Sequence, residues 1–573
     1  MSADMNATNV DSPSLDTLVE ELQRGEETWA ALSLVARRDL LAALSEATQK
    51  HAQEWVDVAC SIKQLPPGSQ LAGEEWISGP YALLTSVRAL SSTLEALEAG
   101  RSPLDGFHIS KAPGGRVAVR VLPHNVFDRL LLSGFRAEVW SKPGVTAQWM
   151  KKAAGFGQRT PKETGGVGVV LGAGNIFSIA PLDTLYELFA HNRVVLLKLN
   201  PITDPLQPVL EKVFARFIEL GLLRIVTGGV DVGAAAVAHP GIGHVHITGS
   251  VKSHDVIVFG PGEEGQARKA RGETLLDKPI TSELGGVSPT IVVPGDWSER
   301  DLAYQAEHIV TQKLHNNGYN CIASQVLVLS DDWPQKETFL ATLRKAFSNA
   351  PARPAYYPGS DDRCAAAVDL HPGVAQRTAD GSRVLLEGVP SSGDAAFAEE
   401  YFAPVLTITS LPGLGREFLS RAVAFANQQL EGTLGANVVA HPKTIRELGS
   451  DFTGAIGDLH YGTVAVNAWT GVGYLTPLAT WGAFPGHTLQ DAQSGIGIVH
   501  NGLLLDGTER TVVHGPFSPF PRSLVNGEFT LSPRPPWFVT NRTAAVTGRL
   551  LTVFAGRASW AKLPAIFASA LRG

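Results

Sequence analysis

Apolar and polar positions follow two different patterns along the chain. Between residues 15 and 60, apolar residues such as Leu40, Leu41 and Leu44 recur at helical spacing among Glu, Arg and Gln, which predicts helices of a scaffold. A looser stretch from 65 to 80 follows. The Gly- and Pro-rich segment 103–115 then predicts a loop before the half-buried strand 116–122.

From residue 167 to 286 the pattern of apolar and polar residues predicts strands, loops and helices in repeated succession. Short apolar runs predict strands at 167–171 and 193–199, helices are expected at 182–190 and 209–220, and another strand begins at 225. Continuous apolar strands separated by helices indicate a parallel sheet covered on both faces. A nucleotide would bind at the carboxyl ends of such strands.

A second alternating series occupies 287–465. It predicts strands at 290–293 and 325–329, a helix at 299–314, and surface loops at 351–373 and 390–394. Beyond residue 500 a proline cluster precedes an apolar, mildly basic tail from 543 to 573. Its basic residues exclude a spanning helix, so we expect it to pack in the core or on a neighbouring subunit, with peripheral membrane contact as the alternative.

The bulk properties narrow the class of protein. A chain of 573 residues is too long to fold around a single hydrophobic core. Its content of 44% hydrophobic and 18% charged residues is typical of folded domains. A net charge of −7 without a basic run argues against nucleic-acid binding. The polar, acidic segment 1–9 lacks the pattern of a secretory signal, no long apolar run appears, and three scattered cysteines suit a reducing compartment, so we expect a cytoplasmic location.

Candidate chemistry centres on Cys321, in the segment HNNGYNCIAS, with Glu283 of the ELGG segment 38 positions upstream. A thiol nucleophile with a carboxylate base is one interpretation, and a buried inert thiol is the other. The segment Gly172-Ala173-Gly174 follows a strand but lacks the third glycine of the dinucleotide fingerprint, so alone it is a weak signal. The 16 histidines show no clear ligand spacing, and no metal site is expected.

Eight segments occur in an order that resembles the NAD(P)-dependent aldehyde dehydrogenase superfamily over roughly residues 15 to 500: GVVLGAGN (168–175), VVLLK (194–198), VTGGVDVG (226–233), HITGS (246–250), ELGG (283–286), the Cys321 segment, EEYFAPV (399–405) and GTVAVN (462–467). The resemblance implies an α/β fold with a Rossmann-type cofactor domain, an α/β catalytic domain and a small oligomerisation element. The expected boundaries are 1–115 with 166–282 (cofactor), 116–165 (bridging or oligomerisation), 283–465 (catalytic) and 466–573 (return to the cofactor and oligomerisation region, then the tail).

The resemblance also implies roles. Cys321 would be the nucleophile, Glu283 the general base, and the Asn175 amide with the Cys321 backbone N–H the oxyanion donors. The alternatives are a turn-forming Asn and an acid that caps a turn. Residues expected to contact NAD or NADP are Lys198, Gly249, Ser250, Leu284, Gly285, Glu400 and Phe402.

Several departures from the family pattern leave questions open. Tyr319 replaces a usual Gln, Leu199 a proline and His254 a glycine, while Pro201 stands where many NAD-preferring relatives carry a glutamate. NAD and NADP therefore both remain candidates. The charged insertion 261–277 is expected near the cofactor entrance.

The sequence thus predicts an enzyme that oxidises a small-molecule aldehyde to a carboxylic acid, as a homodimer or homotetramer. The aromatic residues Trp469, Tyr474 and Trp481 are candidate pocket walls for an apolar aldehyde, or else packing against the tail or a partner subunit. A coenzyme A-acylating dehydrogenase or acyl-CoA reductase is the enzymatic alternative, although such relatives generally lack the glutamate. A catalytically retired member with a structural or binding role is the non-enzymatic one.

Overall fold

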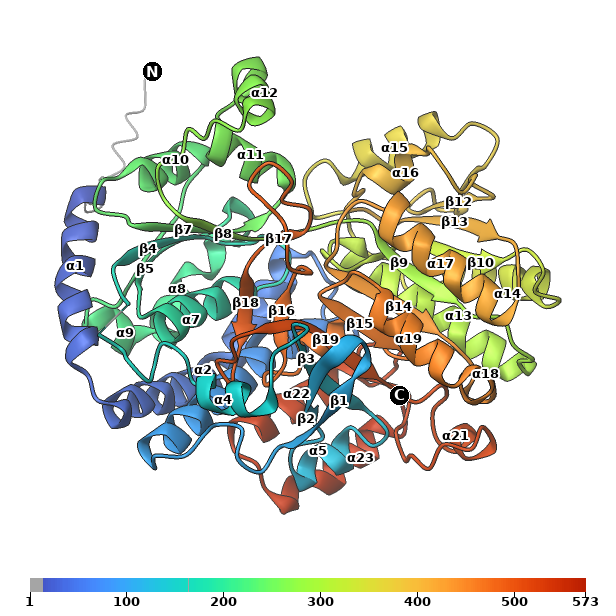
Figure 1. Cartoon of the computed structure of the whole chain (residues 1–573), viewed down its shortest axis with the longest axis horizontal. Coiled ribbons are helices and arrows are strands. Elements are labelled where there is room, and N and C mark those ends of the chain that lie inside the picture. Colours follow the sequence, from blue (N-terminus) through green and yellow to red (C-terminus); the bar gives the residue numbers. More distant parts are fainter. Residues whose placement is uncertain (1–13, 163) are drawn as a thin grey trace, which may run out of the picture.

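A six-stranded sheet organises the first half of the chain in this computed structural model, which describes residues 14–162 and 164–573 (Figure 1). The strand order is β17-β8-β7-β4-β5-β6, and all neighbours are parallel except β17, which is antiparallel to β8. The strands are β4 (Val167–Leu171), β5 (Val194–Lys198), β6 (Leu223–Val226), β7 (His244–Gly249), β8 (Ile280–Leu284) and β17 (Gly495–Ile496).

Helices from two parts of the chain accompany this sheet, and several of them pack on it. One set is α1 (Leu15–Ala31), α2 (Leu34–Ile62), α3 (Ala72–Trp76) and α4 (Ala82–Glu98); the other is α7 (Ile179–His191), α8 (Gln207–Val213), α9 (Ala215–Glu219), α10 (Val230–Ala238), α11 (Val251–Phe259) and α12 (Gly262–Arg271). Leu22, Leu41 and Leu83 share one buried cluster with Val169 and Leu196 of the sheet. The N-terminal scaffold is therefore part of the core of this sheet.

An eleven-stranded sheet of order β1-β2-β3-β19-β15-β14-β9-β10-β13-β12-β11 organises the rest. Its strands are β1 (His108–Ala112), β2 (Arg116–Leu122), β3 (Arg136–Ser141), β9 (Ser288–Val292), β10 (Ser324–Ser330), β11 (Ala375–Arg377), β12 (Val384–Glu387), β13 (Val405–Leu411), β14 (Gly435–Val439), β15 (Thr463–Val466) and β19 (Thr508–His514). Strands β1 to β3 are antiparallel, whereas β12, β13, β10, β9, β14, β15 and β19 run parallel. Segments 108–141 and 508–514 thus extend the sheet that contains β9 and β10.

The remaining helices lie around this sheet and at the chain end. They are α5 (Val126–Leu131), α6 (Ala147–Ala153), α13 (Glu299–Leu314), α14 (Lys336–Asn349), α15 (Ser360–Leu370), α16 (Ala395–Ala398), α17 (Gly415–Gln429), α18 (Pro442–Leu448), α19 (Ser450–Asp458), α20 (Gly471–Tyr474), α21 (Arg522–Val525), α22 (Ala544–Gly556) and α23 (Leu563–Ala570). A two-stranded ribbon of β16 (Thr480–Gly482) and β18 (Ile498–Asn501) lies beside the six-stranded sheet, with β18 against α7 and β8.

The two large sheets are joined where β8 leads into β9 through Gly285 and Gly286. A Cβ on Gly286 would lie 2.8 Å from Ser494 Oγ and 2.9 Å from Gly432 Cα, so no side chain fits there. The tight join places the carboxyl end of β8 beside the loop that precedes β10.

The C-terminal tail packs on helices of the same chain. Helix α22 contacts α3, α4 and the π-helix η1 (Ile77–Tyr81), and this close approach requires small residues: a Cβ on Gly548 would lie 3.0 Å from the Gly73 carbonyl oxygen. Figure 1 shows α22 and α23, coloured red, beside the cyan α5. None of the helices in the described ranges is both long and apolar enough to cross a membrane.

The predicted α/β class and most predicted elements are confirmed, including the helix at 299–314. Three local predictions were wrong. The helix predicted at 209–220 is divided at Phe214, whose backbone is not helical; the expected loop 351–373 contains α15, which buries Cys364 and Ala367; and the stretch 65–80 contains α3 and part of η1. The prediction made for residues 1–9 lies outside the described part of the chain.

Candidate active site

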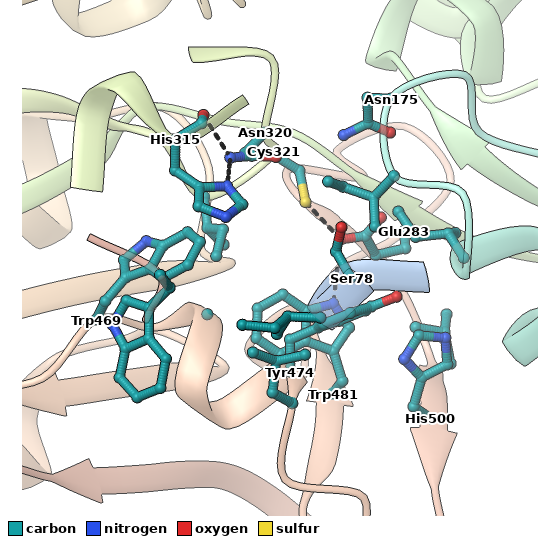
Figure 2. Close-up of a pocket in the computed structure, with 18 residues that line it drawn as sticks. Ser78, Asn175, Glu283, His315, Asn320, Cys321, Trp469, Tyr474, Trp481 and His500 are labelled. Atoms are coloured by element: carbon teal, nitrogen blue, oxygen red, sulfur yellow. Dashed lines mark hydrogen bonds between the residues drawn. The ribbon is translucent and has the colours of Figure 1, made fainter. Parts of the chain in front are cut away.

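A cavity between the two sheets brings together the predicted catalytic residues Cys321, Glu283 and Asn175 (Figure 2). Most of its wall is apolar or aromatic, and Trp469, Tyr474 and Trp481 contribute to it, as do Ile77, Val499 and Trp537. The aromatic residues predicted as pocket walls therefore do line the cavity.

An unusual turn positions Cys321. Asn316, Asn317 and Gly318 adopt successive left-handed conformations with φ of 51°, 55° and 80°, which Asn and Gly tolerate best. The Asn316 side chain donates hydrogen bonds of 3.1 Å and 3.0 Å to the backbone oxygens of Asn175 and Tyr319. The Asn-Asn-Gly sequence thus fixes the loop just before β10, with the cysteine facing the cavity.

Cys321 and Glu283 form a direct pair. The Cys321 thiol donates a hydrogen bond of 3.1 Å to Glu283 Oε1, and the indole N–H of Trp481 donates one of 3.2 Å to the same oxygen, as Figure 2 shows. Burial raises the pKa of Glu283 to about 7. Burial and the neighbouring Glu283 raise the pKa of the Cys321 thiol well above its ordinary value. At neutral pH a protonated thiol therefore faces a carboxylate that titrates in the working range.

Asn175 follows β4, and its side-chain amide contacts the loop that carries Cys321. Asn175 Nδ2 donates a hydrogen bond of 2.9 Å to the Tyr319 carbonyl oxygen, which uses one of its two N–H groups. The preceding Gly174 is required because a Cβ there would lie 2.7 Å from the Asn200 side chain. The second amide N–H of Asn175 is available to a group in the cavity.

The predicted cofactor residues do not line this cavity but lie at two neighbouring places. Lys198, Gly249 and Leu284 end the parallel strands β5, β7 and β8 at one edge of the sheet, where Gly249 pairs with Leu284, and Ser250 begins α11 directly afterwards. Burial lowers the pKa of the nearly buried Lys198. This is the sheet edge at which parallel α/β folds bind nucleotides.

Glu400, Gly285 and Phe402 form the second place, beside the join of the two sheets. A Cβ on Gly285 would collide with the Glu400 carboxylate, so only glycine leaves room for it. Oε1 of Glu400 is buried and has no hydrogen-bond partner within the described ranges, and burial raises the pKa of this residue to about 8. A buried acceptor without a partner fits a ribose hydroxyl, so the residues present suit a nicotinamide dinucleotide.

Two departures from the family pattern have structural consequences. Tyr319 is fully buried, donates a hydrogen bond of 2.8 Å to Ser360, and stacks on Tyr357 with ring centroids 5.4 Å apart. The insertion 261–277 contains α12. Lys269 of α12 forms an ion pair with Asp255 of α11, with 2.7 Å between Nζ and Oδ2.

A buried acid with two histidines behind Glu283 was missed by sequence reasoning. Asp183 Oδ1 lies 3.1 Å from His500 Nε2, Asp183 Oδ2 lies 3.5 Å from His246 Nε2, and Thr248 donates a hydrogen bond of 2.9 Å to Asp183. Burial opposes ionisation of Asp183, but the histidines outweigh it and lower its pKa to about 2. The members come from α7, β7 and β18, so no local motif could have revealed them.

In the ranges 14–162 and 164–573, no group of three or more His, Cys, Asp or Glu residues is arranged to hold a metal ion.

Comparison with known proteins identifies the family to which this chain is similar. The family model described as the aldehyde dehydrogenase family matches residues 146–482. A 3,6-anhydro-alpha-L-galactose dehydrogenase of Streptomyces coelicolor is 25% identical over 477 residues, which cover 80% of this chain and 81% of that protein. A coniferyl aldehyde dehydrogenase of a Pseudomonas species is 28% identical over 192 residues, 32% of this chain and 36% of that protein.

Solved structures share the fold. The gamma-glutamyl-gamma-aminobutyraldehyde dehydrogenase of Burkholderia cenocepacia superimposes with a TM-score of 0.57 at 18% identity, covering 87% of each chain. An indole-3-acetaldehyde dehydrogenase of P. syringae, solved in complex with NAD+, gives a TM-score of 0.57 at 18% identity and covers 87% of this chain and 88% of that one. At this identity the likeness shows the arrangement of the sheets and helices.

Proposed function

The chain belongs to the aldehyde dehydrogenase family and is an NAD(P)-dependent enzyme of it, and from this premise we propose that it oxidises an aldehyde to a carboxylic acid through a thioester on Cys321. One observation carries the proposal: the Cys321 sulfur lies 3.1 Å from a Glu283 oxygen in an apolar cavity. A nucleophile and its base are then already within hydrogen-bond distance.

The first step forms a bond between Cys321 Sγ and the aldehyde carbon. The thiol proton moves to Glu283, which is suited to receive it because its pKa of about 7 lies near neutral pH. The carbonyl oxygen becomes an oxyanion. The free N–H of Asn175 and the backbone N–H of Cys321 are its proposed donors, and each such donor is worth roughly 3 kcal/mol in related sites.

Oxidation requires a hydride acceptor near this carbon. A bound NAD(P) would supply the acceptor for the hydride that leaves this carbon when the thioester forms. Glu400 would accept a hydrogen bond from one ribose hydroxyl and Lys198 would donate to the other ribose, while Gly249, Ser250 and Leu284 would contact the rest of the dinucleotide at the sheet edge.

The second half of the reaction breaks the thioester. Glu283, having released the first proton to solvent, takes a proton from a water molecule that attacks the thioester carbon. The C–S bond then breaks, which releases the carboxylic acid and the Cys321 thiolate. A base beside the sulfur favours hydrolysis over transfer to coenzyme A.

The test is product analysis with NAD and NADP in the absence of coenzyme A. Wild-type protein should form one carboxylate for each reduced cofactor, and Cys321→Ala should form neither. Cys364→Ala is the matched control because Cys364 is a buried free thiol on α15, outside the cavity. Acid formation by Cys321→Ala, or an absolute requirement for coenzyme A in the wild type, would refute the proposed route.

A further inference from the structure

A second, larger cavity lies directly beside the catalytic cavity. The two share three wall residues, Ile77 of η1, Leu475 after α20 and Trp537 of the tail. These side chains therefore lie between the space around Cys321 and the second cavity, which we call the outer chamber.

The C-terminal tail builds most of the far wall of the outer chamber. Leu551, Phe554, Ile566 and Phe567 of α22 and α23 line it, and Phe127 of α5 closes it through an edge contact with Phe554, with ring centroids 5.2 Å apart. The tail lies beyond residue 482, where the match to the family ends. The tail thus supplies about half of the residues that line the chamber, and it lies outside the matched region.

Several polar groups of the chamber are engaged within the protein. Arg88 donates a hydrogen bond to the Ala555 carbonyl oxygen, the Asp128 carboxylate accepts from the backbone N–H of His124 at 2.8 Å, and the Thr547 hydroxyl lies 2.8 Å from that of Ser569. Groups satisfied in this way offer little to a polar ligand, and most of the remaining wall is aliphatic and aromatic.

We propose that the outer chamber receives the hydrocarbon chain of a long-chain aliphatic aldehyde whose carbonyl carbon lies at Cys321. This inference rests on the proposed function and adds the substrate class. The chain would pass between Ile77, Leu475 and Trp537. Leu475 is the least buried of the three and is the side chain that can turn aside most easily.

The experiment measures kcat/KM for saturated aldehydes from propanal to tetradecanal with wild-type enzyme. Burial of each CH2 group in an apolar site should raise kcat/KM by about fourfold until the chamber is filled. In Leu551→Trp the new ring occupies the chamber, so the ratio of dodecanal to propanal kcat/KM should fall at least tenfold. Val553→Trp is the control, because Val553 lies on the same helix and is 50% exposed outside the chamber.

A second readout does not depend on turnover. The fluorescent fatty acid cis-parinaric acid should bind the wild type and Val553→Trp equally and bind Leu551→Trp at least tenfold more weakly. If Leu551→Trp does not fold, as judged by circular dichroism and thermal melting, Ala570→Phe fills the same chamber from the end of α23.

The outcomes separate the two proposals. Oxidation of propanal with no gain from chain length, or an unchanged dodecanal preference in a folded Leu551→Trp, overturns the chamber assignment and leaves the proposed function in place. No oxidation of any aldehyde, together with chamber-dependent binding of cis-parinaric acid, overturns the proposed function and keeps the chamber as a hydrocarbon site.

Discussion

Glu283→Gln tests the electrostatics of the site most directly. Gln has nearly the shape of Glu and its carbonyl oxygen can still accept from the Trp481 indole, which lies 3.2 Å from the native oxygen. The change removes the ability to ionise and to accept a proton. We therefore expect two effects, one on turnover and one on the pH dependence of stability.

The stability effect follows from the raised pKa of Glu283, which burial moves from 4.5 to about 7. Below pH 4.5 the carboxyl is protonated in the folded and unfolded states and has no effect. Between pH 4.5 and 7 the unfolded state ionises first, so folding loses stability as the pH rises, and above pH 7 the full cost of about 3 kcal/mol is present. The variant lacks this cost, and its advantage should grow by about 2 kcal/mol between pH 5.5 and 8.5.

Thermal melting at the two pH values measures this difference. With an unfolding entropy of about 2.1 cal/mol/K per residue over 573 residues, the Tm of Glu283→Gln relative to wild type should rise by about 2 °C more at pH 8.5 than at pH 5.5. Glu399→Gln is the matched control, because Glu399 is an exposed acid outside the catalytic cavity.

Turnover should change in a way that stability alone cannot explain. Glu283→Gln should lose steady-state oxidation, and wild-type activity should rise with pH through about 7 as the base ionises. The same pH-dependence of Tm in variant and wild type would refute the assigned ionisation. Full steady-state turnover by the variant would refute the role as base.

Three further variants test neighbouring parts of the site. Asn175→Ala should lower kcat about 100-fold with little change in KM, since one oxyanion donor is lost, and labelling of Cys321 by iodoacetamide should be unaffected; an unchanged kcat would exclude the role. Asp183→Asn should move the acidic limb of the pH–rate profile to lower pH, because the Asp183 charge raises the pKa of Glu283, and an upward shift would contradict this. Glu400→Gln should raise the KM for NAD(P) and reduce the thermal stabilisation given by the cofactor, with equal stabilisation refuting the contact.

The sequence predicted elements well where local signals agree. The helix at 299–314 has Ser298 and Asp301 as a capping box, and its predicted and observed limits are identical. Helix α15 was missed because its segment follows a proline-rich stretch and its buried residues are only Ser360, Cys364 and Ala367, a pattern too weak to stand out. Such a helix is stabilised by tertiary contact.

The site was predictable only in part. Cys321 and Glu283 were paired through the resemblance, since nothing in a separation of 38 residues brings a β8 side chain to the loop before β10. The pairing of Asp183 with His500 spans 317 residues and depends on how β18 packs against α7. Contacts of this kind arise from the topology of the fold, which local spacing does not reveal.

The arrangement of the two cavities links substrate choice to segments far from the nucleophile. Ile77 comes from the N-terminal helices and Trp537 from the tail, yet both border the space around Cys321. The close approach of Gly548 to Gly73 holds α22 against α3, immediately before η1. Loosening this contact should therefore widen the space between the wall residues that the two cavities share and alter the selection of long aldehydes. Cys321 and Glu283 should keep their geometry, because the catalytic pair is held by β8 and by the turn before β10.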